Sequence, residues 1–148
     1  MSKTSLFVII LLSSLLGACD FHIPTKVVAL NASITGKTDS VFAIKLKEHF
    51  DTEAAQSFIV QVGNEAQRKQ AATYLDGTAS SHTLTLSVPV KIFRNKKLLL
   101  SKTLSASTTT GKLPTTQANR LQIDASYTQL RSTIITELLR RLEYLDEN

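Results

Sequence analysis

Few residues in this chain have the type and spacing that catalysis or metal binding requires. The three histidines, His22, His49 and His82, are far apart in the sequence, and none stands beside a second ligand-type residue at the spacing of a metal site. We also find no nucleophile elbow, phosphate-binding loop or catalytic pair of carboxylates. The sequence therefore predicts no enzyme, no metal and no cofactor. A hydrolase would need a cleft of converging titratable groups, which no motif indicates.

The residue with the most distinctive chemical setting is Cys19, the only cysteine in the chain. An apolar run at 6–16 precedes it, with Lys3 before that run and two small residues between the run and the thiol. The run is too short to span a bilayer comfortably as a permanent helix. This order of charge, apolar core and small residues is typical of a secretory signal peptide, here 1–18.

The segment Leu16-Gly17-Ala18-Cys19 resembles the bacterial lipobox, in which diacylglycerol is attached to the cysteine sulfur. The peptide is then cut before the cysteine and the new amine is acylated. We therefore expect Cys19 to be lipidated on sulfur with diacylglycerol and on nitrogen with palmitate. Each buried CH₂ contributes roughly 0.8 kcal/mol, so two or three chains would hold the protein on a membrane. Residues 19–25 are then a lipidated tether.

Composition predicts a single small domain after this segment. Residues 1–18 contain one lysine and no acid, so the remainder has 16 Lys and Arg against 12 Asp and Glu. This modest positive charge suits an anionic lipid headgroup or sugar phosphate without requiring one, and we expect no nucleic-acid partner. The remaining 19–148 are enough to bury a core, and the domain is predicted at 26–148.

Hydrophobic periodicity predicts an α+β fold in the order β-α-β-β-β-α. The single sheet is expected to have four strands, mostly antiparallel, with two helices on one face. Pro89, on the polar face of a strand, predicts a local edge or bulge there. The predicted strands are 26–30, 58–74 with a bulge at 63–64, 83–92 and 98–107, and the predicted helices are 40–50 and 123–145, with a loop at 31–39 and tight turns near 76–77 and 94–97.

Basic residues gather around the last predicted hairpin and the connection to the last helix. They are Lys91, Arg94, Lys96, Lys97 and Lys102, with Arg68, Lys69, Lys112 and Arg120 nearby in the sequence. Charge-assisted hydrogen bonds from such residues could hold a phosphate. Alternatively, the hairpin lysines protect a sheet edge against aggregation, which we favour for any single residue.

The whole arrangement resembles the lipopolysaccharide-assembly lipoprotein family LptE, also called RlpB. The resemblance rests on the lipobox followed by Phe21-His22, the turn from Tyr74 to Gly77, the strand Leu84-Thr85-Leu86-Ser87-Val88, and a last helix ending in Leu-Leu-Arg-Arg-Leu. It implies a lipid-anchored, non-enzymatic protein at the periplasmic face of the outer membrane. Its implied partners are an LptD-like β-barrel, which it helps to assemble and plugs, and lipopolysaccharide, which it helps deliver to the outer leaflet.

Two residues depart from what the family implies. The family uses a basic lipopolysaccharide contact in the turn after its second strand, where this chain has Leu75 beside Asp76. A second basic contact at the start of the last helix corresponds to Arg120 or to Lys112. Asp20, directly after the lipidated cysteine, resembles an inner-membrane retention signal. Inner-membrane residence would favour an alternative function, a periplasmic lipoprotein adaptor such as a regulator docking on a cell-wall synthase.

Overall fold

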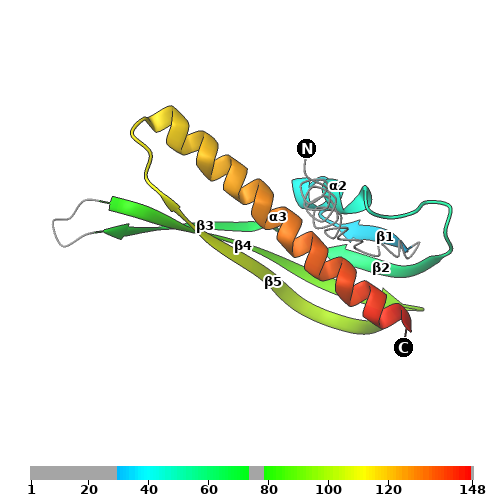
Figure 1. Ribbon diagram of the computed structural model, residues 1–148. Coiled ribbons are helices and arrows are strands. Elements are labelled where there is room, and N and C mark those ends of the chain that lie inside the picture. Colours follow the sequence, from blue (N-terminus) through cyan, green and yellow to red (C-terminus); the bar gives the residue numbers. More distant parts are fainter. Residues whose placement is uncertain (1–29, 74–78, 148) are drawn as a thin grey trace, which may run out of the picture.

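The computed structural model describes residues 30–73 and 79–147, which form one mixed sheet with two helices on the same face (Figure 1). The α+β class and the placement of the helices are confirmed. The signal peptide 1–18, the tether 19–25 and the turn at 76–77 lie outside the described residues. The elements are β1 (Asn31–Gly36), α2 (Val41–Lys47), β2 (Gln56–Val62), β3 (Ala66–Thr73), β4 (Ala79–Arg94), β5 (Lys97–Gly111) and α3 (Thr116–Glu147).

Strand β4 is the centre of the sheet, with β2 and β3 along one side and β5 along the other. All three neighbours run antiparallel to it. Its alternating apolar residues, Leu84, Leu86, Val88, Val90 and Ile92, are each at most 1% exposed, because they face the helices. The period-2 pattern in the sequence predicted this strand correctly.

The predicted strand 58–74 is divided into β2 and β3, which gives five strands instead of four. The two pair with successive parts of β4, and the register shifts by one residue between Val62, opposite Val90, and Ala66, opposite Ser87. At the break, the Gly63 N–H donates to the Pro89 carbonyl at 2.8 Å. Pro89 has no N–H to return, so the predicted irregularity around Gly63 and Pro89 is confirmed as an interruption of the ladder.

The first strand was predicted wrongly. Of 26–30, only Leu30 is described and it is not in a strand, whereas the predicted loop contains β1, paired parallel with β2. Most residues of β1 are polar or glycine, so the sequence did not indicate a strand there. Its apolar residues Ala32 and Ile34 alternate with polar ones and pack against the core. Gly36 ends the strand at φ +85°, and a Cβ there would stand 2.3 Å from the Val62 carbonyl oxygen, so only glycine fits without strain.

Helix α2 begins where the sequence indicated and connects the parallel pair. The Ser40 Oγ accepts a hydrogen bond from the Ala43 N–H at 3.1 Å, an N-cap. Phe42, Leu46 and Phe50 are buried as predicted, although the α-helix itself ends at Lys47.

Helix α3 is longer than predicted and lies across the sheet (Figure 1). Thr115 caps its start, since its Oγ1 accepts from the Ala118 N–H at 3.2 Å. Its buried stripe is Tyr127, Leu130, Ile134, Ile135, Leu138 and Leu142. None of the helices in the described residues is long and apolar enough to cross a membrane.

Two side chains connect α3 to the strands, one in the first half of the helix and one at its C-terminal end. Tyr127 donates its hydroxyl hydrogen to the Arg68 carbonyl of β3 at 3.0 Å. Arg94, at the end of β4, donates to the Leu145 carbonyl at 2.6 Å and pairs with Asp146 at 3.2 Å. The guanidinium of Arg94 also lies 4.6 Å from the centre of the Phe58 ring. A cation at the carbonyl end of a helix is favourable, so Arg94 stabilises the end of α3.

We expect Leu138→Asp to prevent stable folding. Leu138 is 0% exposed in the core, and a carboxylate there would be buried without a partner. The milder change Leu138→Ala should cost about 2–5 kcal/mol through the cavity it leaves. Ser132→Asp, at an exposed position of the same helix, is the control. Thermal unfolding followed by circular dichroism measures all three, and parental stability of Leu138→Asp would contradict the packing described.

Candidate functional site

The titratable residues of the described chain do not converge on a catalytic centre. His49 is exposed at the end of α2, and His82 is buried in β4. No group of three His, Cys, Asp or Glu side chains among 30–73 and 79–147 is arranged to hold a metal ion. Cys19 and His22 lie outside these ranges. The surfaces to consider are therefore those suited to binding.

The candidate lipopolysaccharide contacts lie on either side of the connection between β5 and α3. Lys112 is exposed just after β5, and Arg120 is exposed in the second turn of α3. The connection is ordered by hydrogen bonds, because the Leu113 N–H donates to the Asn119 Oδ1 at 3.4 Å and Thr115 caps the helix. The structure thus places both residues at one end of α3. The Leu75 and Asp76 positions lie outside the described residues.

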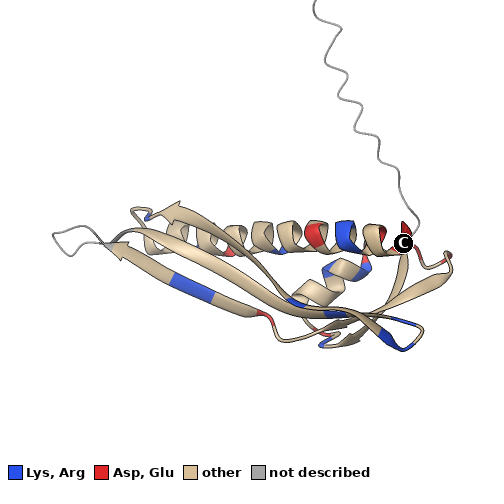
Figure 2. Ribbon diagram, turned by 90° about the horizontal axis from the view of Figure 1, so that it is seen from below, with Lys and Arg blue, Asp and Glu red and all other residues tan. Residues whose placement is uncertain are grey.

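The predicted basic cluster is divided by the fold. Arg94 is engaged with the end of α3 and is not available to a ligand. Asn95 and Lys96 form the hairpin turn with φ of 50° and 66°, as the turn prediction required. Figure 2 shows Lys and Arg on the strands, the hairpin and both helices, whereas Asp and Glu lie on α3 and in connections but not on the strands. The sheet is therefore the positive part of the domain.

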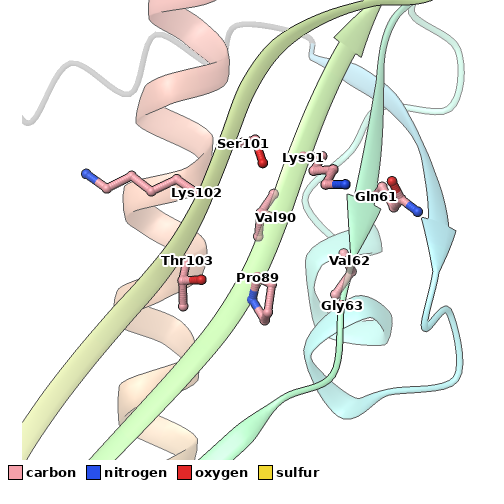
Figure 3. A pocket seen from close by; sticks show the side chains of 9 residues that line it. All are labelled: Gln61, Val62, Gly63, Pro89, Val90, Lys91, Ser101, Lys102 and Thr103. Atoms are coloured by element: carbon pink, nitrogen blue, oxygen red, sulfur yellow. The ribbon is translucent and has the colours of Figure 1, made fainter.

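Lys91 lines a hollow on the face of the sheet that carries no helix. The hollow measures about 400 Å³ and lies where the pairing of β4 passes from β2 to β3, with Gly63 and Pro89 in its lining (Figure 3). Ser101 and Thr103 of β5 contribute hydroxyl groups on its other side. It is open and polar, so it can hold water or meet another surface.

Hydroxyl pairs continue along this outer face, across β4 and β5. Ser87 and Ser105 have their Oγ atoms 2.8 Å apart, and the Oγ1 atoms of Thr83 and Thr109 are 3.4 Å apart. The sequence predicted this Ser- and Thr-rich face. Its small, uncharged side chains make it suitable for contact with a polar protein surface.

A partly buried ion pair that the sequence did not reveal joins α3 to the connection between β2 and β3. The Nε and Nη2 atoms of Arg131 donate to the Glu65 Oε1 at 2.9 and 2.5 Å, and the two side chains are 12% and 13% exposed. Burial by itself raises the pKa of the Glu65 carboxyl. Hydrogen bonds from Arg131 and Gln67, with the Arg131 charge, outweigh burial and lower the pKa below its ordinary value of 4.5. No short-range spacing could have indicated a pair so distant in sequence.

Solved structures with a similar fold are bacterial lipoproteins. Rare lipoprotein B from Shewanella oneidensis matches with a TM-score of 0.69 at 12% identity, over 80% of this chain and 97% of that one. Lipoprotein B from Nitrosomonas europaea matches at 0.64 and 12% identity, over 80% and 84%. A minor lipoprotein from Acinetobacter baumannii matches at 0.51 and 15% identity, over 79% and 93%. No family model matches the chain, and no curated protein matches it significantly.

The domain therefore has the fold of bacterial lipoproteins of the rare lipoprotein B type. The fold implied by the resemblance to LptE is confirmed, since RlpB is another name for that family. At these identities the likeness concerns the fold alone.

We expect the Glu65–Arg131 pair to make stability depend on acidity. The folded state binds a proton at Glu65 less readily than the unfolded state, so the pair stabilises the fold above about pH 4.5 and this stabilisation is lost as the pH falls below that value. Glu65→Gln should lower stability at pH 7 and lose less on acidification. Urea unfolding at pH 7 and pH 3 measures the difference, with Glu53→Gln, an exposed acid, as control. Equal acid losses in the parent and Glu65→Gln would contradict the pair's role.

Proposed function

We propose that this chain is an outer-membrane lipoprotein of the LptE type that assists assembly of an LptD-like β-barrel, plugs it, and takes part in binding and delivering lipopolysaccharide. The observation that carries the proposal is the combination of a lipobox at Cys19 with a domain whose fold matches solved lipoprotein B structures. Neither feature alone has this force, because many lipoproteins have other folds. Together they favour an accessory protein without enzymatic activity.

The outer face of the sheet supports the plug role. The lumen of an outer-membrane barrel is polar, and a plug must present hydrogen-bonding groups to it. The hydroxyl rows of β4 and β5, including the Ser87–Ser105 pair, provide such groups on a face that no described helix covers (Figure 1). The acyl chains on Cys19 would hold the domain at the periplasmic face of the membrane.

Lys112 and Arg120 support the lipopolysaccharide role. Both are exposed cations at one end of α3, and neither has an ion pair within the described ranges. Phosphate groups of the glycolipid would accept charge-assisted hydrogen bonds from them. The charged contact proposed here therefore rests on these two residues, since the turn carries Leu75 and Asp76.

Depletion of the protein tests the proposed function. We expect less lipopolysaccharide at the cell surface and less mature barrel protein in the outer membrane, both restored by the parent gene. Cys19→Ala, which cannot be lipidated, should restore them poorly, and mass spectrometry should find the parent chain beginning at an acylated Cys19. Normal surface lipopolysaccharide after depletion would refute the function. If the protein also stays in the inner membrane, as Asp20 hints, the cell-wall adaptor becomes the better explanation.

Arg120→Ala tests the binding site separately from the fold. Its side chain is exposed, so we expect an unfolding temperature close to that of the parent. Retention of lipopolysaccharide on the purified protein should fall about tenfold, because a charge-assisted contact is lost. Lys47→Ala, an exposed lysine on α2 away from this end of α3, is the matched control (Figure 1). Unchanged retention in Arg120→Ala would remove Arg120 from the site.

A further inference from the structure

The open edge of β5 is a long and regular stretch of backbone. β5 pairs with β4 along one side only, and no other described strand lies along its second side. The one irregularity in the β4–β5 register occurs between Ile92 and Phe93, near the hairpin, so the ladder is regular from Leu100 to Gly111. The other outer strands are less open, because β1 is short and the Arg68 carbonyl of β3 is bonded to Tyr127.

The register shows which backbone groups face this edge. The Pro89 carbonyl accepts from Gly63, so the backbone polar groups of Pro89 point toward β2 and β3. Thr103, opposite Pro89, is then in a non-hydrogen-bonded pair, and its N–H and C=O point away from β4. The same alternation applies to Ser101, Ser105, Ser107 and Thr109. All five are exposed, and none is charged or a proline.

An apolar groove runs beside the edge on the helix side. Two hollows of about 450 Å³ each lie between β5 and α3, and their apolar lining is Leu104, Ala106 and Ile134 in one and Leu100, Tyr144 and Leu145 in the other. Glu137 and Arg141 line both hollows, and Glu137 is paired there with Arg140 and Arg141. Tyr144 is 68% exposed. A strand added to β5 would direct every second side chain over this groove.

The charge around β5 indicates what kind of segment could bind at its open edge. The described residues from 66 to 123 include nine Lys and Arg and no Asp or Glu. Lys102, exposed and opposite Val90, stands on the helix side of β5 beside the groove. A lysine facing inward at an edge opposes indiscriminate pairing. A second copy of β5 has no acidic residue that could pair with Lys102, whereas a partner segment with an acidic side chain at the facing position would pair with it.

We propose that the β5 edge is a docking site for an extended segment of a partner protein, which adds to the sheet as a strand. The segment carries apolar side chains at alternate positions over the groove and an acidic residue at the position facing Lys102. Its backbone pairs with Ser101, Thr103 and Ser105 and their neighbours. The inference goes beyond the proposed function and does not depend on it.

A designed peptide tests the docking site with the full-length chain in mild detergent. The probe is a labelled peptide of alternating threonine and valine, with one central valine replaced by glutamate, and the control probe has lysine there. Fluorescence anisotropy should show the glutamate peptide binding at least about tenfold more tightly than the lysine peptide. Lys102→Glu should reverse this preference. Hydrogen exchange should show slower exchange at the amides of Ser101, Thr103 and Ser105 when the peptide is bound.

A variant pair tests the backbone contact itself. Thr103→Pro removes an N–H that faces the edge and leaves the hydrogen bonds to β4 intact, so affinity should fall about tenfold. Thr103→Val keeps the N–H and should bind like the parent. The proposal is overturned if neither peptide binds, if both bind equally, or if Thr103→Pro folds and binds normally. If Thr103→Pro does not fold, the hydrogen-exchange data test the backbone contact in its place. Slow exchange at the amides of Ser101, Thr103 and Ser105 in a self-associated protein without peptide would overturn the proposal and assign the edge to a second copy.

Discussion

Burial of one face of β4 is the constraint on which the rest of this domain depends. Five alternating side chains of that strand are almost completely inaccessible, and they are covered by α3 and α2 together. At about 25 cal/mol per Å² of apolar surface, burial of this row together with the side chains packed on it stabilises the domain. Because the row is continuous, α3 extends along the sheet. The Tyr127 hydroxyl connects its first half to β3, and Arg94 connects its C-terminal end to β4.

The concentration of apolar contacts on one face leaves the other face free for binding. The outer face carries Ser and Thr pairs and a shallow hollow where the pairing of β4 passes from β2 to β3. Polar groups on that face are exposed and need no partner within the domain, so they add little to stability. The same division gives a domain with an apolar interior and a polar outer face.

Charge follows a similar division. The positive residues lie on the strands and connections of the β3–β5 region, whereas α3 carries ion pairs such as Glu137 with Arg140 and Arg141. Arg94 shows why sequence clustering overstates a binding site, because its guanidinium serves the end of α3. Lys102 differs in that it stands exposed beside a groove. The roles of Arg94 and Lys102 depend on which side chains the fold places beside them. Composition could therefore indicate an anionic partner, but not where on the domain that partner would bind.

The sequence alone determined the elements whose signals are local. The period-2 row of β4, the start of α2 near residue 40 and the long helix α3 could all be predicted, because each depends on residues a few positions apart. Only the tertiary structure decided that β1 pairs parallel with β2, that Glu65 meets Arg131, and that β5 has an open edge. These features join residues that are distant along the chain. Their partners are chosen by how the layers pack, which no local pattern records.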